Sequence, residues 1–104
     1  MSGIDVFTAI ASPVRRQVLD LLRDGPLRAG DVAAAFDMSR PAVSQHLAVL
    51  RSAGLIAEER AGRERRYRID GRPLREVAAW AADYQRFWQD RLAALESLLE
   101  EEQG

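Results

Sequence analysis

The sequence predicts a mainly α fold of the α+β class, in which short helices are followed by a β-hairpin and a long C-terminal helix. Through most of the chain, apolar residues recur every three or four positions, which is the period of an α-helix. Over residues 55–70 the period changes to two, which indicates strands. Because 104 residues suit one modest core, we expect a single domain spanning residues 1–104.

Two helices are predicted in the first quarter of the chain. A short one lies within residues 1–11, where the apolar positions are Val6, Phe7 and Ile10. Ser12 followed by Pro13 is typical of an N-cap and a first helical position, and so predicts the start of the second helix. Gly25 is expected to follow its end as the C′ residue.

Residues 29–53 are predicted to form two helices joined by a tight turn, a helix-turn-helix. The segment GDVAAAF provides about two turns of helix. Ser39 is then expected to cap the second helix, with Pro41 in its first turn and Gly54 at its end. Its buried side is predicted to hold Val43, Leu47 and Leu50.

Residues 55–70 are predicted to form a two-stranded hairpin whose turn lies at AGRE. Five arginines and one acidic residue fall within the nine residues 60–68, so the tip is strongly basic. Charge runs usually form a solvated face, but a basic hairpin directly after a helix-turn-helix is also where a wing would contact a nucleic-acid backbone.

The last predicted helix, over residues 73–102, is apolar around about half of its circumference. This is wider than the ~100° stripe of a helix that packs against one surface. We therefore expect it to bury a second surface against another copy of the chain, although a helix folded wholly onto its own domain is the alternative. The expected dimer interface comprises Val6, Phe7, Ile10, Leu74, Val77, Ala81, Tyr84, Trp88, Leu92 and Leu95.

Charge is unevenly distributed along a chain whose net charge is −1. Residues 28–72 carry nine arginines and six acidic residues, whereas residues 73–104 carry three arginines and seven acidic residues. All fifteen basic residues are arginine, the side chain best suited to bidentate contacts with phosphates and guanines. A basic middle and an acidic tail favour a nucleic-acid surface in the middle of the chain.

The exposed side of the predicted 39–53 helix is small, polar and free of carboxylates. Such a face suits the major groove, which is about 12 Å wide. The N-terminal residues of a recognition helix read bases, so Arg40 is expected to pair with guanine and Gln45 with adenine. An amphipathic helix with a polar solvent face is the alternative. The expected DNA-binding residues are Ser39, Arg40, Pro41, Ser44, Gln45, His46, Arg51, Arg63, Arg65 and Arg66.

The sequence resembles the ArsR/SmtB-type winged helix-turn-helix repressors over residues 5–103. The resemblance is carried by IASPVRRQVLDLL, by SRPAVSQHLAVLRSAGLI and by RAGRERRYRI for the wing. The tail YQRFWQDRLAALESLLEE is similar to the subgroup that lacks metal sites and includes autorepressors. The resemblance implies a homodimeric repressor that binds a palindromic operator on double-stranded DNA, with positions 40, 41, 44 and 45 in the groove.

Departures from the family pattern argue against metal sensing. Where metal-sensing members carry the motif ELCVCD, this chain has PLRAGD, so Arg28 and Gly30 stand in the places of the two cysteines. The chain has no cysteine and one histidine, and its last helix offers only Asp83 and Asp90. We predict no metal site and no cofactor. His46 has three readings: a DNA-backbone contact, a structural bridge to a neighbouring helix, or a ligand or switch.

Other functions find less support in the sequence. No phosphate-binding glycine loop, nucleophile–base pair or HExxH motif is present, so we predict no catalytic residues and no enzyme. A winged helix used only for protein contacts would not need so many arginines. A repressor that holds a small organic effector at Trp80, Tyr84, Phe87 and Trp88 is the main alternative. No apolar run near 18 residues is present, and we expect a cytoplasmic protein.

Overall fold

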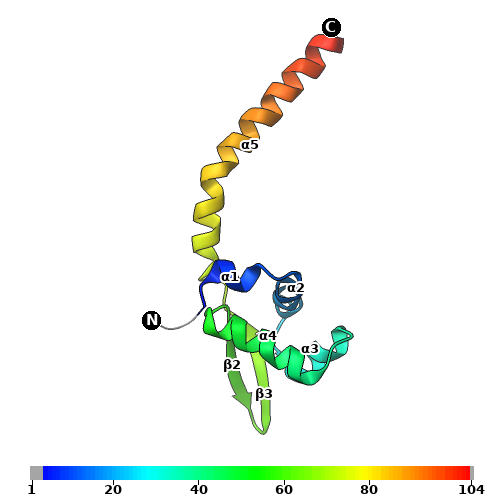
Figure 1. The fold of residues 1–104 in the computed structure, drawn as a ribbon, viewed down its shortest axis with the longest axis vertical. Helices are drawn as coiled ribbons and strands as arrows, with labels where there is room; N and C mark the ends of the chain where they lie inside the picture. The colour runs from blue at the N-terminus through cyan, green and yellow to red at the C-terminus, as the bar shows by residue number, and fades with distance from the viewer. Residues whose placement is uncertain (1–3, 104) are drawn as a thin grey trace. The chain divides into compact units, whose positions relative to one another are not determined.

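A computed structural model describes residues 4–103 of the chain. Figure 1 shows the elements, which follow in the order α1 (Val6–Ile10), α2 (Pro13–Leu22), β1 (Leu27–Arg28), α3 (Ala29–Ala35), α4 (Arg40–Ser52), β2 (Ile56–Ala61), β3 (Glu64–Ile69) and α5 (Leu74–Gln103). The chain divides into two compact units after Leu74. The first unit is a winged helix-turn-helix, and the second is the long helix α5. The predicted mainly α, winged fold is confirmed.

Serine caps start two of the helices, as the sequence predicts. The hydroxyl of Ser12 accepts a hydrogen bond from the backbone N–H of Arg15 at 3.2 Å, and that of Ser39 accepts one from Ala42 at 3.2 Å. Each bond satisfies one of the N–H groups that a first helical turn leaves unpaired. The start of α4, and with it the direction of its exposed side chains, is therefore set by local chemistry.

The ends of α2 and α4 differ from each other. Helix α4 closes with a Schellman motif: Gly54 has a φ of 76°, and the N–H of Leu55 donates to the carbonyl of Leu50 at 3.0 Å. Helix α2 ends earlier than expected, with Arg23 as its C-cap. Gly25, at a φ of 144°, lies two residues beyond that cap, so its assignment as the C′ residue is wrong. Its positive φ belongs to the turn that leads into β1.

The sheet has three strands rather than the two expected. The order is β1-β3-β2, and the short strand β1 pairs antiparallel with β3 through Leu27 opposite Tyr67 and Arg28 opposite Arg66. A two-residue strand is too short to show a period of two, so the sequence alone gave no sign of it. Its pairing attaches the start of α3 to the wing.

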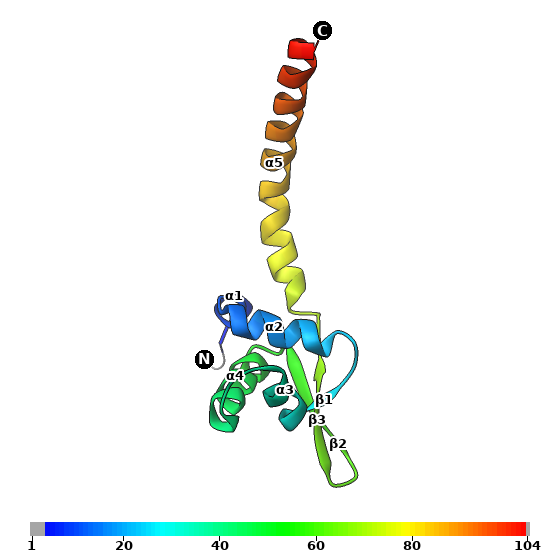
Figure 2. The same cartoon turned by 90° about the vertical axis from the view of Figure 1, so that its right-hand side faces the viewer.

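The hairpin β2–β3 turns on two residues, Gly62 and Arg63, between the paired residues Ala61 and Glu64. Gly62 has a φ of 68° and occupies the first turn position, where a type II′ turn requires glycine. Figures 1 and 2 show that the turn lies at the far end of a hairpin that projects beyond helices α3 and α4. The wing tip is thus open to solvent.

The core of the first unit is aliphatic and centres on one side of α4. Leu47 is 2% exposed, and Leu50 and Leu55 are fully covered. The other buried apolar side chains are Val6, Ala9, Val18, Leu19, Leu22, Val32, Val43 and Ile56. Burial of one side of α4 fixes which of its residues face solvent. No helix within the described part of the chain is long and apolar enough to cross a membrane.

Candidate nucleic-acid interface

The solvent side of α4 carries short polar and apolar side chains. Arg40, Pro41, Ser44 and Gln45 are all exposed, and the helix contains no acidic residue. Ser39, as the N-cap, is exposed directly before them. The structure therefore brings the predicted base-reading residues together at the N-terminal end of one face. The helix itself therefore brings no carboxylate towards a phosphate backbone, and the carboxylates beside it belong to Asp31 of α3 and Glu58 of β2.

Arg40 lies between the two helices of the helix-turn-helix. A Cβ added at Gly30 in α3 would meet the Arg40 Nη1 atom at 3.4 Å, an ordinary van der Waals contact, so the Arg40 guanidinium lies against the start of α3. The two residues line a pocket of about 490 Å³ together with Ser44 of α4, with Arg65 and Tyr67 of the wing, and with Arg28 and the acidic Asp31 at the start of α3. Within residues 4–103 no ion pair holds Arg40, so its donors are available to a base or a phosphate.

The wing arginines do not share one face. Side chains alternate across a strand, so Arg65 lies on the face of the hairpin that also carries the buried Ile56, and Arg66 lies on the opposite face. Arg63 is exposed in the turn itself. Of the three predicted wing contacts, the structure therefore places Arg63 at the tip and Arg65 beside α4. Arg66 points the other way.

Acidic partners neutralise several of these arginines. Glu58 pairs with Arg51 at 2.8 Å and with Arg65 at 3.4 Å, whereas Arg66 pairs with Glu64 at 3.1 Å. The sequence predicts Arg51, Arg65 and Arg66 as DNA-binding residues but does not indicate these acidic partners. Arg63 has no ion pair within the described residues.

A second acidic cluster joins α3 to the opposite face of the wing. Arg28 bonds Asp31 at 3.2 Å and Glu64 at 3.1 Å. The Arg28 guanidinium lowers the pKa of Asp31, and Asp31 in turn raises the pKa of Arg28. Arg28 is also the N-cap residue of α3, and its backbone N–H donates to the Asp31 carboxylate at 3.2 Å. It therefore has a structural role at one of the two positions where the resemblance places cysteines in metal-sensing members.

His46 lies between two helices rather than on the exposed face of α4. It is half-buried, and its Nδ1 atom lies 3.4 Å from Arg15 Nη1 in α2. Arg15 also donates to the carbonyls of Ala9 at 2.7 Å and Thr8 at 3.1 Å, so it caps the end of α1. This geometry favours the structural reading of His46, as a bridge from the recognition helix through Arg15 to α1. Sequence periodicity gave no sign of Arg15, because its partners lie on other elements.

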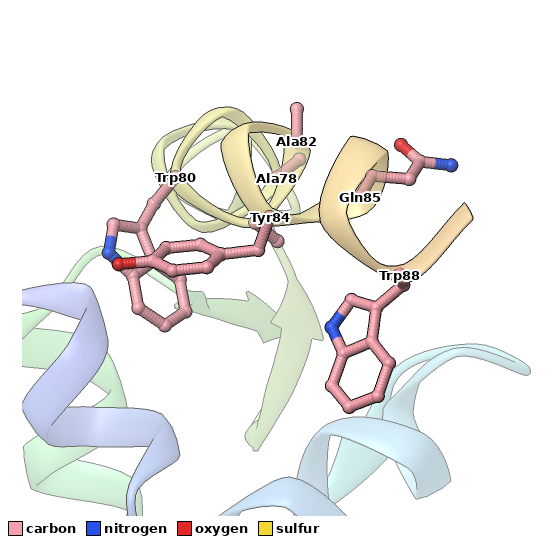
Figure 3. Close-up of a pocket in the computed structure, with 7 residues that line it drawn as sticks. Ala78, Trp80, Ala82, Tyr84, Gln85 and Trp88 are labelled. Atoms are coloured by element: carbon pink, nitrogen blue, oxygen red, sulfur yellow. The ribbon is translucent and has the colours of Figure 1, made fainter. Parts of the chain in front are cut away.

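The helix α5 carries an exposed apolar face. Trp80 and Tyr84 pack with ring centroids 5.2 Å apart, and Figure 3 shows that they project from the same side of the helix as Trp88, whereas Gln85 points away. Together with Ala78 and Ala81 these rings line a groove of about 470 Å³. Further along the helix, the exposed apolar side chains are Phe87, Leu92, Leu95, Leu98 and Leu99.

The residues expected at the dimer interface, in the first unit and on α5, differ in how much surface they expose to a partner. Val6 is 4% exposed and packs in the core of its own unit. Phe7 and Ile10 are half-exposed, as are Leu74 and Val77 at the start of α5. Ala81, Tyr84, Trp88, Leu92 and Leu95 are all exposed. Val6 therefore leaves little surface for a partner, and most of the exposed apolar surface among the expected residues lies on α5.

Metal-ligating side chains do not gather in the structure. Over residues 4–103 no three His, Asp or Glu side chains lie close enough to hold an ion, and the sequence has no cysteine. Asp83 and Asp90 both lie on α5, two turns apart.

A helix-turn-helix followed by a basic β-hairpin defines a winged helix-turn-helix protein, and comparison with known proteins identifies its family. Residues 12–58 match the model described as "Bacterial regulatory protein, arsR family". The transcriptional repressor SdpR of Bacillus subtilis is 38% identical over 80 residues, which cover 77% of this chain and 89% of SdpR. The chain belongs to the arsR family of bacterial regulatory proteins.

Two further proteins extend the comparison. The HTH-type transcriptional regulator Rv2034 of Mycobacterium tuberculosis is 40% identical over 94 residues, which cover 90% of this chain and 85% of Rv2034. Among solved structures, the homodimeric winged helix-turn-helix DNA-binding domain of Mb0332 from Mycobacterium bovis aligns with a TM-score of 0.62 at 33% identity, over 76% of each chain. The resemblance inferred from the sequence is confirmed.

Proposed function

We propose that this protein is a homodimeric transcriptional repressor that binds a palindromic operator and acts without a metal ion. One observation carries the proposal: the exposed face of α4 is free of carboxylates and begins with Arg40, beside an arginine-bearing wing. Phosphate contacts position such a protein, and base contacts specify its site. We place Arg40 and Gln45 on base edges, and Ser39 and Arg63 on the backbone.

The apolar face of α5 supports the dimer. Trp88 is 63% exposed and Leu92 57%, which is costly for side chains of this size in a protomer that remains alone in water. A second copy of the same helix offers the same apolar face, so a two-fold interface would cover both. Two copies of α4 would then meet two half-sites of an inverted repeat.

The donor chemistry supports action without a metal. A soft-metal site needs thiolates, and a zinc or nickel site draws on imidazoles, of which each chain supplies one. That imidazole, on His46, lies beside the positively charged Arg15, a surrounding that opposes binding of a cation. Because the DNA of a bacterium lies in its cytoplasm, we also propose a cytoplasmic protein.

In vitro selection from a random DNA library tests the proposal. We expect the purified protein to enrich an inverted repeat whose half-sites lie about one helical turn apart. A library that shows no enrichment after repeated rounds, with folded protein, would contradict it. The same experiment supplies the preferred site that the later measurements need.

A repressor that responds to a small apolar effector is the second candidate, and the groove formed by Trp80, Tyr84 and Trp88 favours it. Ring-lined apolar grooves bind drug-sized molecules, but the same rings also suit a dimer interface. Tryptophan fluorescence separates the two. An apolar probe such as anilinonaphthalene sulfonate that quenches the tryptophans of the dimer and weakens operator binding would support the effector site.

A further inference from the structure

Glu58 is the acidic residue that joins the recognition helix to the wing. It lies on β2, and its two carboxylate oxygens hold different arginines: Oε2 lies 2.8 Å from Arg51 Nη1 in α4, and Oε1 lies 3.4 Å from Arg65 Nε in β3. The three residues line one polar groove of about 690 Å³. Both arginines keep further N–H groups that Glu58 does not occupy.

The other two carboxylates of the hairpin are placed differently. Glu59 pairs with Arg68 at 3.3 Å, and Glu64 pairs with Arg66 at 3.1 Å, both on the opposite face. Their side chains are 43% exposed, whereas that of Glu58 is 18% exposed. Exposed ion pairs are weak and screened by salt, but a partly covered pair is screened less. Glu58 is therefore the least exposed carboxylate of the hairpin, and it pairs with the two arginines on the face that we propose for DNA, whose own side chains are 58% and 63% exposed.

We infer that Glu58 is a specificity-determining residue, which holds Arg51 and Arg65 in one orientation and so disfavours DNA whose phosphates lie elsewhere. This inference rests on the proposed DNA binding through α4 and the wing. When α4 is docked on its preferred site, the phosphates have fixed positions, and arginines already oriented by Glu58 reach them with their remaining donors. On random DNA the arginines must leave Glu58 to reach a phosphate.

Restraining cations in this way lowers sequence-independent affinity more than specific affinity. Random DNA is bound almost entirely through phosphates, so any cost of freeing Arg51 and Arg65 falls fully on that mode. Specific binding also has base contacts from α4, and there Arg51 and Arg65 contact phosphates without leaving Glu58. A carboxylate that penalises the wrong complex increases the difference between the two affinities.

Glu58→Gln, which keeps the shape and removes the charge, tests the inference, with Glu59→Gln as the matched control on the same strand. We expect Glu58→Gln to bind random duplex DNA about threefold or more tightly. The slope of log K against log salt concentration should become steeper by about one, because an arginine freed from Glu58 releases about one more counterion from DNA. The affinity for the selected site should stay level or fall, so the ratio of the two affinities decreases. Glu59→Gln should change that ratio less.

Several results would overturn the inference. These are unchanged or weaker binding of random DNA by Glu58→Gln, equal tightening on both DNAs, and an equal effect of Glu59→Gln. If Glu58→Gln does not fold, as judged by circular dichroism, Arg65→Gln is the deciding variant. It should lower the affinity for the selected site more than the affinity for random DNA, and equal losses of the two affinities would overturn the inference. A wild-type protein that binds no DNA would instead contradict the proposed function, and with it the inference.

Discussion

Replacing Trp88 with aspartate removes the largest exposed ring from the face of α5 that we assign to the dimer. A tryptophan offers up to about 250 Å² of surface, and 63% of Trp88 is exposed in the protomer, which leaves roughly 150 Å² for a partner to cover. At about 25 cal/mol per Å², covering that area stabilises the dimer by about 4 kcal/mol from each protomer. A buried carboxylate without a partner adds a further penalty. Both protomers lose this contribution, about 8 kcal/mol in all, so we expect dimerisation to weaken by about 10⁵-fold or more.

Sedimentation velocity at micromolar protein concentration measures this effect directly. The control is Gln89→Asp, which adds the same charge at the next position of α5, on the side that carries polar residues. We expect Trp88→Asp to sediment as a monomer and to lose operator affinity, while Gln89→Asp remains a dimer. A Trp88→Asp protein that stays dimeric with unchanged operator affinity would refute the assignment of this face to the dimer.

Three further predictions follow from the structure. Arg40→Ala should lose roughly 1–3 kcal/mol of binding free energy on the selected site, and the protein's sequence preference should relax. Equal losses of binding free energy on selected and random DNA would exclude base reading by Arg40. Titration with zinc, nickel, cadmium or arsenite should leave operator binding unchanged, whereas a reversible tenfold loss, about 1.4 kcal/mol of coupling, would contradict metal independence. Asp70→Asn should lower the thermal unfolding midpoint at pH 7, because hydrogen bonds from Arg72 lower the pKa of Asp70 from 3.8 to about 2. Because the pKa of Asp70 is lower in the folded state, the ionised carboxylate stabilises the fold above pH 3.8, and this stabilisation is lost as the pH falls towards about 2. The difference in unfolding midpoint between the wild-type protein and Asp70→Asn should therefore shrink over that pH range, as calorimetry can measure.

The features that the sequence predicts well are those set by neighbouring residues. Ser12 and Ser39 cap helices through bonds to residues three positions away, and Gly54 and Gly62 supply the positive φ that a helix end and a tight turn require. Helical spacing then identifies the buried side of α4, and with it the exposed side. These signals depend on short stretches of chain, so one sequence is sufficient to read them.

The features that the sequence does not predict depend on residues far apart in the chain. Strand β1 is two residues long, and its partner on β3 lies about forty residues later. The Arg15–His46 contact and the Arg51–Glu58–Arg65 cluster each join separate elements. Alternation along a strand predicts that Arg65 and Arg66 face opposite ways, but it does not identify the carboxylate that each one meets. Composition therefore indicates a basic wing without showing which cations are free.

In the proposed complex, two copies of α4, held by one dimer, read the two halves of an inverted repeat. The most direct test is the affinity of the wild-type protein for the selected site and for a version in which about five base pairs, half a helical turn, are inserted between the half-sites. The insertion turns one half-site to the other side of the duplex, so we predict that affinity falls to that of a single half-site. Equal affinity for the two duplexes would show that the two α4 helices do not read an inverted repeat together.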